Sequence, residues 1–233
     1  FPGYGFSDKP KKGYHYTLLH QADIALEVWR LLGIRGGHLL AHDMGDSVAT
    51  ELIARRIEKT LPKWFDIGFK SLTLTNGSIV MQFAQLRIMQ KLLLTKLGKS
   101  LSFLSNRWIF GHKIKSAHGD VPLDEKEIDR LWAMQLHNNG KKIVHRTIHY
   151  ILDRKQFEAS RWLPALSQTQ TPIHICWGKK DAVAKVQTAH FLQQNICPKA
   201  SLTILENVGH FGQLGSPTAW LKAILAYYTA DIK

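Results

Sequence analysis

Cysteine is scarce in this sequence: only Cys176 and Cys197 occur among its 233 residues. Two cysteines exclude a disulfide framework and a cysteine-rich zinc site, although the two could still pair with each other. Because a low cysteine content is typical of proteins that fold under reducing conditions, we expect a cytoplasmic location.

Acidic residues are also few, with 18 Asp and Glu against 31 Lys and Arg. The resulting net charge of +13 favours anionic partners or surfaces, but it carries no information about the fold. Long apolar runs are missing as well. Lysines interrupt one of the longest, from Lys91 to Leu97, far short of the roughly 18 apolar residues that a membrane-spanning helix needs. We therefore predict no membrane span.

The first residues lack an initiator methionine and the basic and apolar segments of a signal peptide. The glycine and proline in residues 1–8 instead predict a loop. We expect that the chain starts inside a fold and that strands at its N-terminal side are missing.

Apolar residues make up 45% of the chain, which is enough for a well-buried core. Apolar residues recur at helical spacing over residues 17–33, 47–57 and 184–195, and again after residue 215. Short β-rich runs lie between these helices. They cover residues 38–42, 70–75, 172–177 and 201–205. Strands that alternate with helices predict an α/β fold with a mostly parallel sheet flanked by helices.

One connection is too long for a simple crossover helix, because 95 residues separate residue 76 from residue 172. Helical periodicity recurs within it over residues 83–98, 125–138 and 142–155. We predict a core made of residues 1–76 and 172–233, with a helical lid inserted at residues 77–171. The lid tryptophans Trp108, Trp132 and Trp162 are expected to pack in its interior.

The most informative segment is the pentapeptide from Ala41 to Gly45, which follows an apolar strand and precedes a helix. Small residues on both sides of a central polar residue are typical of a nucleophile elbow, a sharp turn that projects the central side chain into a cleft. That central residue is Asp43. An aspartate is already ionised at neutral pH and can attack a carbon directly, which gives an ester of the enzyme itself. A histidine oriented by a second carboxylate would then activate water to hydrolyse the ester.

Both partners follow in the expected chain order. Asp181 comes after the third predicted strand, and His210 comes after the fourth. Nucleophile, acid and histidine in this order are typical of α/β-hydrolases. Ser47 is an alternative nucleophile, but it lies in the helix rather than at the turn. Asp43 could also simply cap the helix, and Asp181 and His210 could be ordinary loop residues.

These residues resemble those of the epoxide hydrolase and haloalkane dehalogenase branch of the α/β-hydrolases, and within it the mesoderm-specific transcript protein family. The resemblance extends from Phe1 to the C-terminal helix and rests on five segments. They are Gly3 to Pro10, His42 to Asp46 with Val48 and Ala49, Leu74 to Gly77, and the loops carrying Asp181 and His210.

The resemblance implies an α/β-hydrolase fold and a hydrolase that needs no cofactor or metal. Asp43 would be the nucleophile, His210 the base and Asp181 its orienting acid, and the backbone N–H of Met44 would bind the oxyanion. The substrate would be a small or medium apolar molecule, and opening of an epoxide is the favoured reaction.

Three departures from that branch stand out. The chain contains no His-Gly-x-Pro segment, which supplies the second oxyanion donor there. Met44 replaces the tryptophan that binds halide in haloalkane dehalogenases, which makes dehalogenation less favoured. Epoxide hydrolases use two lid tyrosines as proton donors, whereas Tyr150 is the one tyrosine within residues 77–171.

Two further interpretations stay open. His145, His149 and Asp153 have a helical spacing that can bind zinc, but Arg146 stands where a metalloprotease needs glutamate. Residues 67–119 contain no acidic residue and eight basic ones among apolar residues, which is also found in segments that lie on a membrane surface. A non-catalytic relative that docks on a membrane or a partner through its basic lid is therefore the alternative. No motif supports nucleic-acid binding, and the oligomeric state is open.

Overall fold

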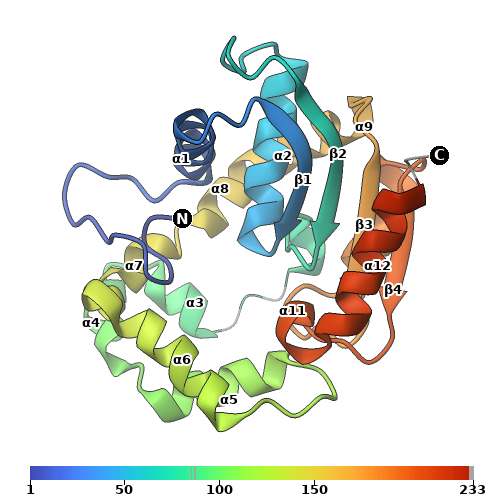
Figure 1. The fold of residues 1–233 in the computed structure, drawn as a ribbon. Helices are drawn as coiled ribbons and strands as arrows, with labels where there is room; N and C mark the ends of the chain where they lie inside the picture. Colours follow the sequence, from blue (N-terminus) through green and yellow to red (C-terminus); the bar gives the residue numbers. More distant parts are fainter. Residues whose placement is uncertain (85, 87, 231–233) are drawn as a thin grey trace.

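Figure 1 shows the computed structural model of this chain, which describes residues 1–84, 86 and 88–230. Its centre is a sheet of four parallel strands in the order β1-β2-β3-β4. The strands are β1 (Gly36–His42), β2 (Gly68–Thr75), β3 (Ile173–Gly178) and β4 (Ser201–Leu205). The α/β fold with a parallel sheet is confirmed, and each predicted strand boundary lies within two residues of the observed one.

Four principal helices are neighbours of these strands in the chain. They are α1 (Leu18–Leu31), α2 (Met44–Ile57), α10 (Val186–Phe191) and α12 (Pro217–Ala230). The Thr17 hydroxyl accepts a hydrogen bond from the backbone N–H of His20 and so caps the N-terminus of α1. α10 is shorter than its apolar pattern suggests, because its last turn continues as a π-helical turn, Leu192–Ile196.

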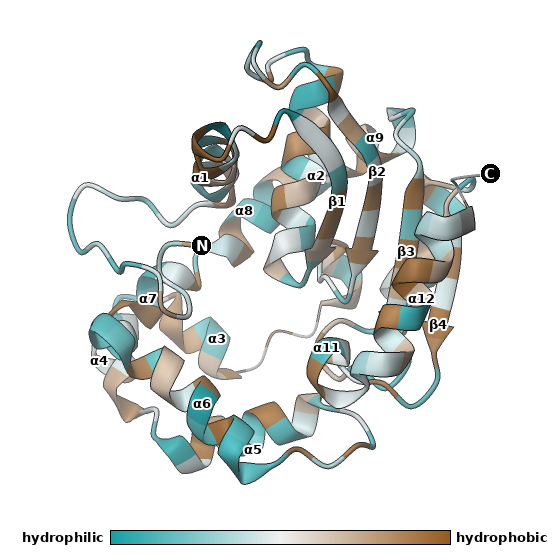
Figure 2. Ribbon diagram, in the orientation of Figure 1, coloured by the Kyte–Doolittle hydropathy of each residue, from teal (hydrophilic) through white to brown (hydrophobic). Residues whose placement is uncertain are grey.

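The two faces of the sheet differ in polarity because neighbouring residues of a strand point to opposite sides. Leu74 of β2 is fully buried in the main apolar core, which also contains residues of α2. On the opposite face, the hydroxyl groups of Thr73 and Tyr228 are 3.1 Å apart, and the ring of His174 stacks on Tyr227. α12 therefore covers the more polar face, and Figure 2 shows hydrophobic residues along much of β2 and β3.

Among the described residues between β2 and β3, all the regular secondary-structure elements are helical. They are α3 (Ile88–Leu93), α4 (Gly98–Leu101), α5 (Arg107–Ala117), α6 (Glu125–Leu136), α7 (Val144–Thr147), α8 (Tyr150–Phe157) and α9 (Leu163–Gln168), with short 3-10 turns at 81–83, 102–104 and 137–143 and a π-helical turn at 158–162. In Figure 1, α3 to α6 lie beyond the arrowheads of β1 and β2, at the carboxyl ends of the strands.

Two of the three helices predicted in this segment are wrong in extent. In the predicted helix over 83–98, residues 85 and 87 lie outside the described part of the chain. Among the others, α3 ends at Leu93 and a helix resumes only at α4, because the Thr95 hydroxyl donates to the Leu92 carbonyl and accepts from the Leu97 N–H between them. The pattern over 142–155 is divided between α7 and α8. The third, over 125–138, ends at Leu136 because Asn138 and Asn139 adopt left-handed conformations with φ of 50° and 61°.

One buried carboxylate ties this segment to the core. Glu51 of α2 has a side chain that is only 1% exposed. It accepts hydrogen bonds from Arg55 at 2.9 Å, from two nitrogens of Arg161 at 2.7 and 3.0 Å, and from the indole N–H of Trp162 at 2.9 Å. We call these four residues the Glu51 cluster. Trp162 is fully buried, as predicted, whereas Trp108 is 76% exposed, so the prediction that it packs inside is wrong.

Candidate active site

Asp43 occupies the turn between β1 and α2, and the predicted strand, turn and helix are all present. Its backbone has φ 50° and ψ −111°, a conformation that non-glycine residues rarely adopt and that is found at functional turns. The Asp43 N–H donates to the carbonyl of Thr75 at 3.1 Å, which fixes the turn against the end of β2. The side chain is 40% accessible and lines a cavity.

His210 lies on the loop after β4 and connects two carboxylates. Its Nδ1 is 2.9 Å from Oδ2 of Asp181, and its Nε2 is 3.7 Å from Oδ2 of Asp43. The fold therefore brings together three residues that are far apart in the sequence. His42 supports the same loop, because its Nε2–H donates to the backbone carbonyl of His210 at 2.8 Å.

Asp181 is held by more hydrogen bonds than a solvated loop residue would have. Its Oδ1 accepts from the backbone N–H groups of Val183 and Ala184 at 2.6 and 2.8 Å, and its side chain is fully buried. Its Oδ2 also accepts from the amide of Asn76 at 2.7 Å. Asn76 was not predicted as a site residue, although its position directly after β2 would have been a signal, since the carboxyl ends of parallel strands share one edge.

Asp43 and His210 hold each other in charged form. Burial alone would lower the pKa of His210, but the hydrogen bonds and charges of Asp181 and Asp43 outweigh burial and raise that pKa to about 10. Burial alone would raise the pKa of Asp43, but His210 and the charges of Arg154 and His42 outweigh it and hold that pKa below its ordinary value. The resting site therefore contains an ionised Asp43 beside an imidazolium.

A second aspartate lies close to the elbow. Asp46, in the first turn of α2, is fully buried, and its Oδ1 accepts the backbone N–H of Thr75 at 3.1 Å. Burial raises its pKa well above the ordinary value, which disfavours a second negative charge beside Asp43. The space is tight, because any side chain at Gly77 would collide with this carboxyl group.

Arg154 of α8 is the most prominent site residue that the sequence did not indicate. It is 3% exposed, its Nε donates to the Ser47 hydroxyl at 2.9 Å, and its Nη2 donates to the Asp43 carbonyl at 3.3 Å. Nη2 is also 3.7 Å from Oδ1 of Asp43. Ser47 is fully buried and is absent from the residues that line the cavity, which weakens the serine alternative.

Tyr150 lies one helical turn before Arg154, on the same side of α8. The guanidinium of Arg154 is 4.7 Å from the centre of its ring, and the amide of Gln90 is 3.5 Å from its hydroxyl. Burial raises the pKa of Tyr150, so the phenol keeps its proton. Met44, the remaining predicted site residue, is the first residue of α2, and its backbone N–H follows Asp43 directly.

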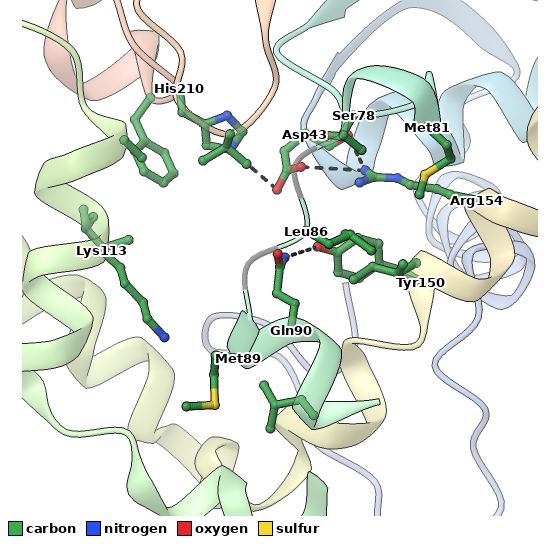
Figure 3. Close-up of a pocket in the computed structure, with 17 residues that line it drawn as sticks. Asp43, Ser78, Met81, Leu86, Met89, Gln90, Lys113, Tyr150, Arg154 and His210 are labelled. Carbon is green, nitrogen blue, oxygen red and sulfur yellow. Dashed lines mark hydrogen bonds and ion pairs between the residues drawn. The ribbon is translucent and has the colours of Figure 1, made fainter. Parts of the chain in front are cut away.

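Two adjoining cavities extend from this group of residues. The first has a volume of about 250 Å³ and contains both polar catalytic candidates and an apolar wall, as Figure 3 shows. Its lining includes Asp43, His210, Tyr150, Arg154, Met81, Leu86, Met89, Leu93 and Ile114. The second has a volume of about 290 Å³ and is lined mainly by apolar residues of α3 and α5 and of the segments around α4 and α7. Met89, Leu93, Lys113 and Tyr150 line both.

A second tyrosine reaches this region from outside residues 77–171. Tyr4, in the N-terminal loop, lines the second cavity, and its hydroxyl donates to the carbonyl of Thr147 at 3.2 Å. Burial raises its pKa, and the nearby Tyr150 and Asp43 raise it further. A count of lid tyrosines alone could not find Tyr4, because the N-terminal loop and α7 meet only in the folded chain.

Metal ligands are not clustered in the part of the chain that the structure describes: it holds no group of three His, Cys, Asp or Glu suited to a metal ion. Of the residues with zinc-like spacing, Asp153 accepts the backbone N–H of Leu18 at 2.7 Å, and His145 lies 3.4 Å from the Ser102 hydroxyl. Asp153 therefore serves to attach α8 to α1.

Comparison with known proteins gives one family match over most of the chain. Residues 1–217 match the model of the alpha/beta hydrolase fold family. LipZ of Mycobacterium tuberculosis, whose name assigns it to the hydrolases, is 35% identical over 230 residues, which are 97% of this chain and 76% of LipZ. The human mesoderm-specific transcript homolog protein is 32% identical over 233 residues, with 97% of this chain and 68% of the relative covered.

Solved structures show the same fold at low sequence identity. A haloalkane dehalogenase variant from Bradyrhizobium elkanii superposes with a TM-score of 0.74 at 20% identity, with 98% of this chain and 78% of that chain covered. A 2-hydroxy-6-oxo-6-phenylhexa-2,4-dienoate hydrolase from Rhodococcus superposes with a TM-score of 0.71 at 16% identity, with 97% and 77% covered.

Proposed function

This chain belongs to the α/β-hydrolase family, and we propose that it hydrolyses its substrate through an ester formed on Asp43. The favoured substrate is an epoxide on a small or medium apolar molecule. The observation that carries the proposal is the arrangement of Asp43, His210 and Asp181, with His210 within 3.7 Å of the first and 2.9 Å of the second. An aspartate at the elbow is suited to attack carbon without a base.

In the first step, Oδ2 of Asp43 forms a bond to an epoxide carbon while the bond from that carbon to the epoxide oxygen breaks. The oxygen needs a proton, and Tyr150 is the donor that lines the same cavity as Asp43. The phenolate left behind is stabilised by the guanidinium of Arg154, 4.7 Å from the ring centre, until it is reprotonated. Tyr4, which lines the adjoining cavity, is a candidate for a second hydroxyl contact with the substrate.

In the second step, the ester is hydrolysed by water. Ester formation removes the negative charge of Asp43, and that charge is one of the causes that raise the pKa of His210. The imidazolium then loses its proton more readily, and this proton passes through water to the Tyr150 phenolate, which leaves His210 as a neutral base. His210 accepts a proton from water as the water oxygen attacks Cγ of Asp43, and collapse of the intermediate releases the diol and restores the carboxylate.

Trapping the ester tests the proposal. In His210→Gln the ester should form but should not be hydrolysed, because the base is missing while Asp43 is unchanged. Protein treated with styrene oxide should therefore carry a stable ester on the peptide that contains Asp43, detected by mass spectrometry. Bromohexane tests an alkyl halide in the same way, and p-nitrophenyl butyrate, which would acylate a serine, tests Ser47 as the nucleophile. With the wild-type chain the adduct should be transient.

His190→Gln is the matched control, because His190 lies exposed on α10 and away from the cavity. This variant should turn over substrate at the wild-type rate without an adduct. An adduct on Ser47, or no adduct with any of the three probes, would contradict the proposal.

A second candidate function is docking on an anionic membrane surface, and one observation favours it. From α3 to α5, five large apolar side chains are exposed by 52% or more. A group of exposed apolar side chains is unusual on a protein surface that binds neither a partner nor a membrane. The five are Ile88, Leu97, Phe103, Leu104 and Trp108. Exposed lysines lie among them in the sequence, at Lys91, Lys96 and Lys99. We call these eight residues the apolar-basic segment.

The structure reduces the charge available to such a surface. Arg107 and Lys115 belong to the acid-free stretch, but Arg107 pairs with Glu125 and Asp129 of α6, and Lys115 pairs with Glu125. The stretch is therefore less basic in the folded chain than in the sequence. No helix among the described residues has the length and apolarity needed to cross a membrane.

Vesicle sedimentation tests this second candidate. Phosphatidylserine-containing vesicles should bind the chain at low salt and release much of it at high salt, since each lysine near an anionic surface contributes about 1 kcal/mol. Trp108→Ser should bind more weakly, whereas Leu31→Ser, which alters an exposed leucine of α1, should bind as the wild type does. Binding that is independent of anionic lipid and of salt would rule out this surface.

A further inference from the structure

Arg154 is a buried cation beside the reacting carboxylate, and the steps described above do not account for its position next to Oδ1. Only 4% of its side chain is exposed. Its Nη2 is 3.7 Å from Oδ1 of Asp43, while Nε2 of His210 is 3.7 Å from Oδ2 of the same carboxylate. Each carboxylate oxygen of Asp43 therefore has its own cation, as the dashed lines of Figure 3 show.

The two cations respond differently when Asp43 becomes an ester. Formation of a bond at Oδ2 removes the negative charge that balances both of them. His210 can release its proton and become neutral. The guanidinium of Arg154 cannot be deprotonated in a protein, so it is left as a buried cation without its counter-ion, a costly state.

We propose that Arg154 is a catalytic residue that stabilises the oxyanion formed when the Asp43 ester is hydrolysed. This inference rests on the proposed function. With Oδ2 bonded to the substrate, Oδ1 is the carbonyl oxygen of the ester. Water adds to Cγ and gives its proton to His210, and the electron pair of the C=O bond moves to Oδ1, beside Nη2 of Arg154. When the intermediate collapses, the electron pair on Oδ1 re-forms the C=O bond and the Cγ–Oδ2 bond breaks. Oδ2 leaves as a hydroxyl oxygen of the diol with the remaining proton of the attacking water, and the water oxygen completes the restored carboxylate.

The environment of Arg154 matches this role. Ser47 and the backbone carbonyl of Asp43 hold Nε and Nη2 at 2.9 and 3.3 Å, so the guanidinium is oriented before the charge develops. Burial strengthens its interaction with an anion compared with the same pair in water. Arg154 also disfavours the neutral ester relative to the states before and after it, because those states carry a negative charge at Oδ1 and the ester does not.

Rapid mixing with styrene oxide, acid quenching and mass spectrometry measure ester formation and ester breakdown separately. Arg154→Met should slow ester formation modestly, because the Tyr150 phenolate loses its neighbouring cation, and should slow ester hydrolysis much more, about 10²-fold, the usual effect of losing one oxyanion donor. The ester should therefore accumulate although His210 is intact. Arg154→Lys retains the charge and should recover part of the rate of breakdown.

Arg161→Met is the matched control. Arg161 also connects the segment between β2 and β3 to α2, through Glu51 at 2.7 Å, but it does not line the cavity. If Arg154 served only to attach α8 to α2, Arg161→Met would slow ester breakdown as much as Arg154→Met. Ester breakdown at the wild-type rate in Arg154→Met would also overturn the inference.

Failure of this inference can be told apart from failure of the proposed function. If His210→Gln retains the ester on Asp43 while both Arg154 variants hydrolyse it normally, only the role of Arg154 is wrong. If His210→Gln never forms an ester, the aspartyl-ester mechanism is wrong, and the role of Arg154 is excluded with it. Should Arg154→Met fail to fold, as judged by its circular dichroism spectrum, Arg154→Lys decides: breakdown at the wild-type rate would contradict the need for an oriented guanidinium donor.

Discussion

Replacing Asp43 with alanine is expected to lower kcat by about 10⁴- to 10⁶-fold, the range found when a catalytic nucleophile or its essential partner is removed. The reason is that the methyl group of alanine cannot attack carbon, so no ester forms and the reaction has no first step. Steady-state turnover of styrene oxide measures the loss, and mass spectrometry after exposure to substrate should find no adduct on the variant.

The control for this prediction is Asp66→Ala. Asp66 is 48% exposed and pairs with Arg35 at the surface. It does not line the cavity that contains Asp43, so its loss should leave turnover unchanged. Residual activity near the wild-type level in Asp43→Ala, together with a large loss in Ser47→Ala, would show that the nucleophile had been assigned to the wrong residue.

Replacing Glu51 with alanine is expected to lower the free energy of unfolding by about 3–5 kcal/mol, the usual cost of removing one partner of a buried ion pair. The carboxylate accepts hydrogen bonds from Arg55, Arg161 and Trp162, and its side chain is 1% exposed. Without it, the Arg161 guanidinium and the Trp162 indole N–H lose a buried partner. Urea denaturation of the two proteins measures the difference.

The contribution of Glu51 to the free energy of unfolding depends on pH, and the sign of this dependence follows from the pKa shift. Burial alone would raise the pKa of Glu51, but hydrogen bonds from Arg161, Trp162 and Arg55 outweigh burial and lower it from its ordinary value of 4.5. A pKa that is lower in the folded state stabilises the protein above the unfolded-state value. The stability difference between wild type and Glu51→Ala should thus be complete above about pH 4.5 and shrink as the pH falls further.

Glu27→Ala is the comparison for a surface pair. Glu27 and Arg30 form a salt bridge in which both side chains are about half exposed, so its loss should destabilise the protein far less than the loss of Glu51. If Glu51→Ala were no more destabilising than Glu27→Ala, the Glu51 cluster would not be the main attachment of the π-helical turn 158–162 to α2.

Several features of this protein could be predicted from the sequence because they depend on neighbours in the chain. The period of the apolar residues predicted the four strands and the principal helices of the core, since each pattern is repeated within a few residues. The small residues around Asp43 predicted the turn. Asp181 and His210 could be selected because both follow strands of one parallel sheet, whose carboxyl ends share an edge.

The helices between β2 and β3 were less predictable. Their apolar periodicity continues through residues 83–98 and 142–155, but local hydrogen bonds of Thr95 and the junction of α7 and α8 interrupt it. Apolar spacing reports which face of a helix can be buried. It does not report where side-chain hydrogen bonds compete with the helix, so the lengths of these helices were overestimated.

The tertiary structure alone decided which side chains surround Asp43. Arg154 is 111 residues from Asp43, Asn76 is 105 residues from Asp181, and Tyr4 is 143 residues from Thr147. In the sequence each belongs to an ordinary helix, strand end or loop, and none has a spacing that points to its partner. The reason is physical: strand and helix formation depends on local periodicity, whereas the charge balance of a buried site depends on which elements pack together.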